Sequence, residues 1–152
     1  MVDQDHGKDL YVKNDFFRML CGELLGTGSA RSVYQSVLDD HLVFKFETKA
    51  NSFQNVIEWE TWERIKETEF AKWFAPCVAI SPCGSVLIMQ KTTRSANHPD
   101  KVPGFFTDLK YANFGILVGK NAGDFVCHDY GVHLLMEKGM TKRLRTANWW
   151  NE

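Results

Sequence analysis

The chain has 152 residues, of which 44% are hydrophobic and 24% charged, a composition typical of one globular domain with a single core. Its formal net charge is −1, so no global charge favours nucleic acid or an anionic membrane as a partner. The polar start predicts no signal peptide, and no apolar run is long enough for a membrane span. The four cysteines form no CxxC pair, which favours reduced thiols in a cytoplasmic protein.

The first part of the chain predicts a short helix followed by an antiparallel meander. Residues 14–20 hold enough apolar side chains for one or two helical turns. Strands are expected at 22–25, 32–37 and 42–47, joined by a glycine-containing turn and by a second polar turn. In the third strand, alternation places Lys45 on the face opposite the phenylalanines.

A helix and a hairpin are expected next. The apolar pattern becomes helical over 52–68, and Pro76 ends the short apolar turn that follows. Strands at 77–81 and 85–91 flank a Pro-Cys-Gly turn and predict a β-hairpin. The polar stretch 92–103, with two prolines and no periodicity, predicts a connecting loop.

The last part predicts a second hairpin and a terminal helix. Residues 115–118 and 124–128 form the two expected strands of this hairpin. From His133 onward the apolar residues, the last of them Leu144, predict one helix that is interrupted at Gly139. We therefore expect an α+β fold built on a five-stranded antiparallel sheet.

Two glycines, Gly26 and Gly28, lie in the turn between the first two expected strands. At such a turn, backbone amides can approach a phosphate with no side chain in the way. Arg31 stands where a GxGxxG pattern would have its third glycine, so a plain hairpin turn is the more common explanation of this signal alone. A strand follows the glycines, which argues against a Rossmann site.

Lys45 lies at the centre of the third strand, 19 residues after Gly26. A solvent-facing lysine is the ordinary alternative, but from this strand it would reach phosphates bound under the glycine turn. A semi-buried lysine needs a carboxylate partner. The predicted helix offers three of them: Glu58, Glu60 and Glu63. We favour Glu58, because apolar residues follow it at i+4 and i+7 and would place its face on the sheet.

A third group of residues carries the chemistry of phosphoryl transfer. Asp108 supplies a carboxylate to orient an attacking hydroxyl, Lys110 a cation for the transferred phosphate, and Asn113 an amide oxygen for a metal ion. Asp129, in Asp-Tyr-Gly, adds the carboxylate that a hard cation such as Mg²⁺ prefers. Taken singly, Asp108 is also typical of a turn cap, and Asp-Tyr-Gly of a turn after a strand.

The order of these signals, GxG, strand Lys, helix Glu, DLKxxN and DYG, resembles the signature of the protein-kinase superfamily over residues 24–131. Within that superfamily, the chain most resembles short bacterial and bacteriophage kinase-like proteins. The resemblance implies a single kinase-like domain over 1–152, with an N-lobe at about 14–91 that holds the sheet and one αC-type helix. Residues 92–152 would form a strongly reduced C-lobe.

The resemblance also implies a site for ATP with Mg²⁺ or Mn²⁺. Nucleotide binding is expected of one group of residues: Gly26, Gly28, Lys45, Glu58 and Met89, the last near the adenine. Asn113 and Asp129 would hold the metal ion, and Asp108 and Lys110 would act in catalysis.

The chain departs from the family in its second half. Only about fifteen residues separate Thr92 from Asp108, and 21 follow Gly131, with no APE-like sequence among them. Phe106 and Thr107 stand where the family has His-Arg. The helical platform that docks protein substrates is therefore expected to be nearly absent.

Two classes of function follow. A phosphotransferase acting on an unknown protein or small-molecule acceptor is favoured by the presence of all the polar signature residues. A pseudokinase-type module that modulates or inhibits a partner protein is favoured by the missing platform. We lean to the enzyme. A nucleic-acid-binding module ranks third, because the basic run at 142–145 is short and typical of a solvated helix face. A reduced lower lobe would expose apolar surface, which leaves a homodimer open.

Overall fold

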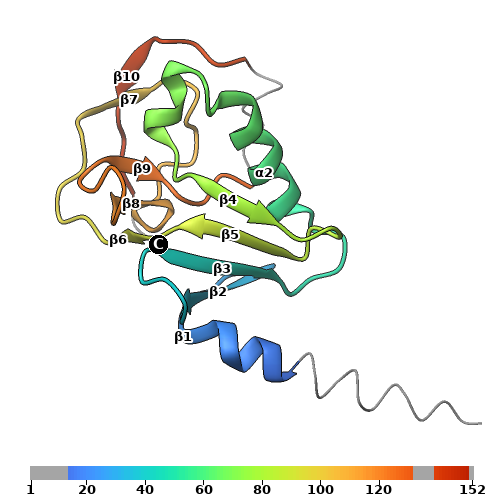
Figure 1. Ribbon diagram of the computed structural model, residues 1–152. Coiled ribbons are helices and arrows are strands. Elements are labelled where there is room, and N and C mark those ends of the chain that lie inside the picture. Colours follow the sequence, from blue (N-terminus) through green and yellow to red (C-terminus); the bar gives the residue numbers. More distant parts are fainter. Residues whose placement is uncertain (1–13, 132–138, 151–152) are drawn as a thin grey trace, which may run out of the picture.

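The computed structural model describes residues 14–131 and 139–150, and its largest unit is a five-stranded antiparallel sheet (Figure 1). The sheet has the order β1-β2-β3-β5-β4. Its strands are β1 (Cys21–Thr27), β2 (Arg31–Ser36), β3 (Leu42–Glu47), β4 (Cys77–Ile80) and β5 (Val86–Gln90). The helix α2 (Gln54–Ile65) connects β3 to β4 and packs against the sheet. The expected α+β class and five-stranded antiparallel sheet are thus confirmed.

The two faces of the sheet differ, as the alternation along β3 predicts. On one face, the expected helix over residues 14–20 is present, and its Phe17 ring lies 5.0 Å from Tyr34 and 5.2 Å from Phe46. On the other face, Lys45 points toward α2 and is only 3% exposed. Because successive side chains of β3 point to opposite faces, the outer face of the sheet is aromatic and the inner face carries the charged Lys45.

The helix α2 is shorter than the sequence predicts, and its buried face is more polar. Its buried residues are Asn55, Glu58, Thr61 and Ile65. A 3₁₀ helix, η1 (Glu69–Trp73), follows after Thr68, whose hydroxyl accepts a hydrogen bond from the amide of Phe70. The amide of Asn55 donates to Glu47 at 2.7 Å near the start of α2. Periodicity alone predicts a helix over 52–68, which is too long at both ends, because local hydrogen bonds determine where α2 begins and ends.

The rest of the described chain forms two small sheets. One has the order β6-β8-β9 and is built from β6 (Thr92–Thr93), β8 (Phe114–Leu117) and β9 (Phe125–Cys127), with the 3₁₀ helix η2 (Tyr111–Asn113) just before β8. In the other, β7 (Lys101–Pro103) pairs with β10 (Leu144–Thr146). The hairpin expected at 115–128 is therefore observed.

Two predictions for this part of the chain were wrong. Residues 92–103 hold β6 and β7 where a loop was expected, and Leu144 lies in a strand where a helix was expected. Their polar sequences show no periodicity because each strand is two or three residues long and held by backbone pairing with a distant segment. Residues 139–143 are not helical either, and residues 133–138, on which the start of the helix prediction falls, lie outside the described residues.

The hydrophobic core joins the five-stranded sheet to the second half of the chain. The ring of Phe74 is 1% exposed and lies 5.2 Å from Phe106 and 5.0 Å from Tyr130. Leu87 and Met89 of β5 are fully buried in the same cluster. This packing brings residues 106–130 onto the face of the sheet that carries Lys45. Over the described residues, no helix is long and apolar enough to cross a membrane.

Candidate functional site

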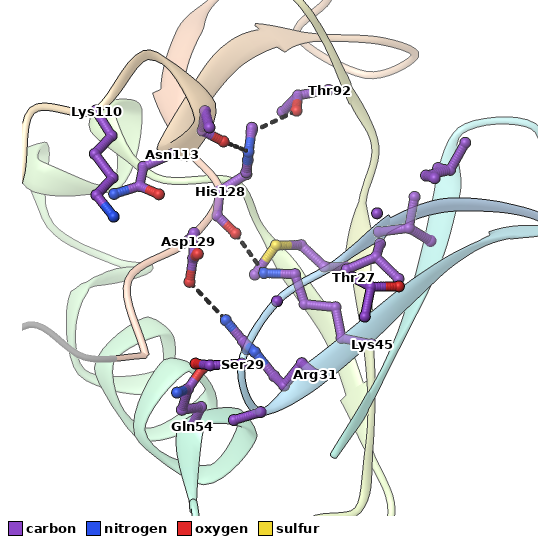
Figure 2. A pocket seen from close by; sticks show the side chains of 18 of the residues that line it. Thr27, Ser29, Arg31, Lys45, Gln54, Thr92, Lys110, Asn113, His128 and Asp129 are labelled. Carbon is purple, nitrogen blue, oxygen red and sulfur yellow. Dashed lines mark hydrogen bonds and ion pairs between the residues drawn. The ribbon is translucent and has the colours of Figure 1, made fainter. Parts of the chain in front are cut away.

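A cavity of about 590 Å³ lies where the second half of the chain meets the five-stranded sheet (Figure 2). Its walls come from the β1–β2 turn, from β3 and β5, and from residues 108–113 and 128–129. Eight predicted site residues line it: Gly26, Gly28, Lys45, Met89, Asp108, Lys110, Asn113 and Asp129. The ninth, Glu58, is fully buried behind Lys45.

The expected glycine turn begins later than predicted: Gly26 lies within β1, paired with Val33, and Gly28 follows the strand. Neither Gly26 nor Gly28 has a positive φ, so any residue could adopt their backbone conformation. A Cβ atom on Gly26 would meet open space, and one on Gly28 would come no closer than 3.9 Å to the carbonyl oxygen of Arg31. Both glycines line the cavity, and each position has room for a small side chain. Neither packing nor a positive φ therefore requires glycine at these two positions.

Lys45 reaches the cavity from the centre of β3 and is fixed there by Glu58. Its Nζ lies 3.0 Å from Oε2 and 3.2 Å from Oε1 of Glu58, and it also donates a hydrogen bond to the carbonyl oxygen of His128. Glu60 is exposed, and Glu63 forms an ion pair with Lys66. Of the three glutamates, the structure therefore brings Glu58 to the lysine.

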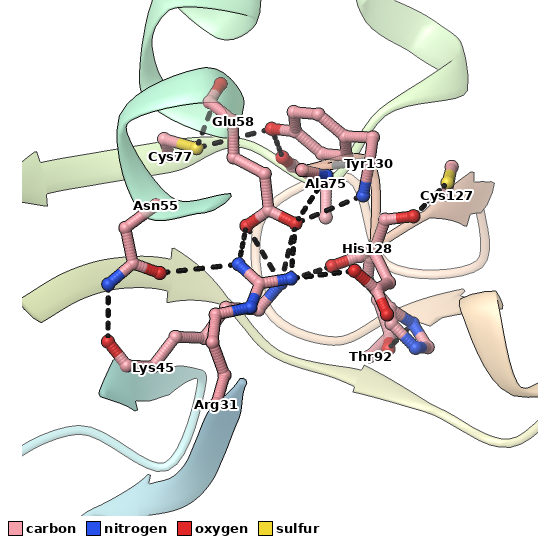
Figure 3. Close-up of polar contacts among 12 residues, drawn as sticks. Arg31, Lys45, Asn55, Glu58, Ala75, Cys77, Thr92, Cys127, His128 and Tyr130 are labelled. Carbon is pink, nitrogen blue, oxygen red and sulfur yellow. Dashed lines mark hydrogen bonds and ion pairs between the residues drawn. The ribbon is translucent and has the colours of Figure 1, made fainter. Parts of the chain in front are cut away.

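Glu58 is the centre of a buried polar network (Figure 3). Besides Lys45, it binds Arg31, whose Nη1 lies 2.8 Å from Oε2 and whose Nη2 lies 2.9 Å from Oε1. Its Oε1 also accepts the backbone N–H groups of Tyr130 and Gly131, at 3.0 Å and 3.1 Å. Burial by itself raises the pKa of this carboxyl, but attraction to Lys45 and Arg31 outweighs burial and lowers the pKa to about 2.

Arg31 is the site residue that sequence reasoning missed. Its side chain is 6% exposed, lines the cavity, and binds Asp129 at 2.6 Å and Asn55 at 3.2 Å in addition to Glu58. The predicted second strand began one residue too late, at 32, which left Arg31 in the turn. Had it begun at 31, alternation would have placed Arg31 on the same face as Val33, which pairs with Lys45.

The segment 108–113 presents a carboxylate and an amide to the cavity. Nδ2 of Asn113 donates to Oδ2 of Asp108 at 2.9 Å, which holds the carboxylate in place. The same bond directs the amide oxygen of Asn113 away from Asp108, and Figure 2 shows it on the side of Asp129. The carbonyl oxygen of Asn113 also accepts the amides of His128 and Asp129, so these two segments are held side by side.

His128 supports the cavity as a neutral ring. Its Nε2 lies 2.7 Å from the carbonyl oxygen of Ala112, and its Nδ1 lies 2.7 Å from the hydroxyl of Thr92. Because a carbonyl only accepts, Nε2 carries the proton and Nδ1 accepts from Thr92. Burial first, and then the charge of Lys45, lower the pKa of His128 to about 4. The ring therefore orients its neighbours and carries no charge near neutral pH.

The residues at the centre of the cavity fit a divalent cation that is shared with a phosphate. The ion pair with Arg31 uses Oδ1 of Asp129, and Oδ2 has no hydrogen bond among the described residues. Figure 2 shows the side-chain amide oxygen of Asn113 on the side of that carboxylate. No group of three or more His, Cys, Asp or Glu in residues 14–131 and 139–150 forms an all-protein metal site. Mg²⁺ commonly binds through one or two carboxylates and substrate phosphates, so this donor set suits it.

Comparison with known proteins leaves the chain without a family. No family model and no curated protein matches it. Among solved structures it is similar to the streptomycin–ATP–APH(2")-IIa ternary complex, with a TM-score of 0.41 and 14% sequence identity. The match covers 62% of this chain and 31% of the other, so the matched part spans about a third of that protein's length. A likeness this distant carries no argument, and the functional conclusion rests on the geometry of the cavity.

Proposed function

We propose that this chain binds ATP with Mg²⁺ or Mn²⁺ in the cavity and transfers a phosphoryl group to a hydroxyl of an unknown acceptor. The observation that carries the proposal is the collection, around one cavity, of an open glycine turn, a buried lysine and two carboxylates. These groups come from segments up to about 100 residues apart, so neither a local turn nor a local ion pair accounts for their meeting. A kinase-like fold, with a reduced second lobe over 92–152, is part of the same proposal.

Each residue has a role that follows from its contacts. The backbone at residues 26–28 binds phosphate oxygens. The ammonium group of Lys45 neutralises their charge, and Glu58 holds that ammonium group in position. Asn113 and Asp129 would hold the metal ion, which when bound neutralises charge on the phosphates. Asp108, fixed by Asn113, orients the acceptor hydroxyl and accepts its proton. Lys110 stabilises charge on the transferred group, and Met89 lies against the adenine.

A second function is favoured by one observation. Asp129, the proposed metal ligand, forms a 2.6 Å ion pair with Arg31, and a carboxylate engaged in this way is a weaker ligand. A chain in which this pair persists would bind nucleotide without transferring phosphate, and would act as a module that modulates a partner protein. The two functions share the cavity and differ in whether Asp129 binds metal.

Nucleotide binding is tested by thermal denaturation with ATP, with and without Mg²⁺. Ligand that binds only the folded protein raises its stability by mass action, by about 2.7 kcal/mol when the ligand is at 100 times its Kd. We expect ATP to raise the Tm, Mg²⁺ to increase that shift, and Asp129→Asn to remove the magnesium-dependent part. Asp40→Asn, an exposed aspartate in the β2–β3 turn, is the control. No shift in the wild type at millimolar ATP would refute nucleotide binding.

Phosphoryl transfer is tested by following label from γ-labelled ATP to the protein and to a cell lysate. Asp108→Asn keeps the size of the side chain but removes the base, so we expect unchanged ATP binding and loss of transfer. Asp40→Asn should transfer as the wild type does. Equal labelling by wild type and Asp108→Asn would refute the catalytic role. Nucleotide binding without transfer in either protein would favour the binding module.

A further inference from the structure

Arg31 lines the cavity but has no role in the phosphoryl transfer proposed above. Its guanidinium lies between two carboxylates: fully buried Glu58 (Figure 3), and Asp129, whose side chain is 42% exposed (Figure 2). On the inner face of the sheet it is a near neighbour of Lys45, since Lys45 pairs with Val33, two residues from Arg31. Two cations therefore approach the cavity from adjacent strands.

Among the side chains in direct contact, the charges balance only while Asp129 is included; Glu47, half-buried opposite Arg31 on β3, also acts on the charge of Arg31 but forms no ion pair with it. Arg31 and Lys45 carry two positive charges, and Glu58 and Asp129 carry two negative ones. If Asp129 binds a metal ion, the three remaining residues have an excess of one positive charge, and all three are less than 10% exposed. An uncompensated buried charge is costly. A phosphate oxygen in the same cavity is the anion that would restore the balance.

We propose that Arg31 is a second phosphate-binding residue beside Lys45, and that Asp129 exchanges Arg31 for the metal ion when nucleotide binds. The inference rests on the proposed nucleotide function and adds a residue and an order of events to it. Arginine suits the role because its fork of donors keeps contact with Glu58 while other N–H groups turn to a phosphate. Metal and nucleotide then bind cooperatively, because each compensates the charge that the other leaves unbalanced.

The test measures two affinities in three variants. ATP binding is measured by calorimetry in excess EDTA, and Mn²⁺ binding without nucleotide by the loss of the free-ion electron paramagnetic resonance signal. Arg31→Met removes the charge, Arg31→Lys keeps the charge without the fork, and Arg64→Met removes an exposed arginine from the last turn of α2. Circular dichroism confirms that each variant is folded.

The two affinities should change in opposite directions. In Arg31→Met we expect metal-free ATP to bind about tenfold more weakly, because one charge-assisted contact is lost. Mn²⁺ alone should bind more tightly, because Asp129 no longer has a competing partner. Arg64→Met should match the wild type in both. If Arg31→Met does not fold, Arg31→Lys provides the test of ATP affinity. We expect Arg31→Lys to bind ATP more weakly than the wild type does.

Other outcomes overturn the inference. ATP affinity in Arg31→Met equal to that in Arg64→Met would assign Arg31 a structural role only. Tighter ATP binding in Arg31→Met would mean that Arg31 blocks the site. Wild-type affinity in Arg31→Lys, where that variant decides, would show that the fork is not used. These results leave the proposed function intact, whereas absence of ATP binding by the wild type refutes both.

Discussion

At the scale of single residues, Glu58 holds the site together because one carboxylate satisfies four donors. Two donors are the charged side chains of Lys45 and Arg31. The other two are the backbone amides of Tyr130 and Gly131, which lie more than 70 residues further along the chain. Replacing this carboxylate by a neutral group would leave Lys45 without its carboxylate partner in the interior and Arg31 with Asp129 alone. The buried face of α2 is polar at this point for that reason.

We therefore expect Glu58→Gln to destabilise the protein by about 3 to 5 kcal/mol at pH 7, the range for a buried ion pair that loses one partner. Urea denaturation measures the free energy of unfolding. Glu60→Gln, at an exposed position two residues on, should change it by less than about 0.5 kcal/mol. Equal effects of the two substitutions would contradict the network.

The pH dependence of stability follows from the same pKa shifts. The pKa of Glu58 is lowered from 4.5 to about 2 on folding, so its contribution is present above pH 4.5 and is lost as the pH falls toward 2. The pKa of His128 is lowered from 6.5 to about 4, so the unfolded chain binds the proton first and stability falls between pH 6.5 and 4. Both groups therefore make the fold acid-sensitive, in adjoining pH ranges.

At the scale of elements, glycines have opposite roles in two turns of the site. At Gly131, a Cβ atom would lie 2.7 Å from the carbonyl oxygen of Gln54, because α2 begins directly against the Asp-Tyr-Gly segment. At Gly28, the nearest atom would be 3.9 Å away. The first glycine permits close packing of elements, and the second leaves room at the cavity.

This difference predicts opposite outcomes for two matched substitutions. Gly131→Ala should lower the free energy of unfolding by about 1 to 3 kcal/mol, because backbone must move to relieve the contact. Gly28→Ala should leave stability nearly unchanged but weaken ATP binding, because a methyl group enters the path of the phosphates. Urea denaturation and ATP titration of both variants check this. A stable Gly131→Ala, or a Gly28→Ala that binds ATP normally, would contradict the respective role.

At the scale of the whole molecule, residues 149–150 pack against the segment that carries Lys110. The amide of Trp150 donates to the carbonyl oxygen of Leu109, and the amide of Tyr111 donates to that of Trp150. The indole of Trp149 donates to the carbonyl oxygen of Pro99 at 2.8 Å and packs against Phe114. Segments from three regions of the sequence thus hold the residues on either side of Lys110.

Trp149→Ala should therefore destabilise the protein by about 3 kcal/mol, since it removes a packed aromatic side chain and its hydrogen bond. Trp150→Ala is the matched control: the residue is 43% exposed, and its ring centroid lies 4.9 Å from Nζ of Lys110, a contact with a free energy of about 0.5 to 1 kcal/mol. Thermal denaturation of both variants gives the comparison. A larger loss for Trp150→Ala would show that this segment is held differently.

The sequence by itself determined the elements with strong local patterns. Alternation in the third strand and the spacing of apolar residues after Glu58 were enough to place Lys45 and Glu58 toward each other, because both patterns report which face of an element is buried. The meander, α2 and the hairpin that follows it were predictable for the same reason. The residue types of Asp108, Asn113 and Asp129, at their spacing, were enough to suggest one shared site.

Only the tertiary structure decided the partners of Arg31 and the course of the chain after Thr92. Arg31 binds Asp129 across 98 positions of sequence, and nothing local indicates that pairing. The strands β6, β7 and β10 are too short for periodicity, and their hydrogen bonds depend on segments that the core brings alongside. Local pattern shows which side of an element faces inward, whereas the partner it meets there is set by the packing of the whole chain.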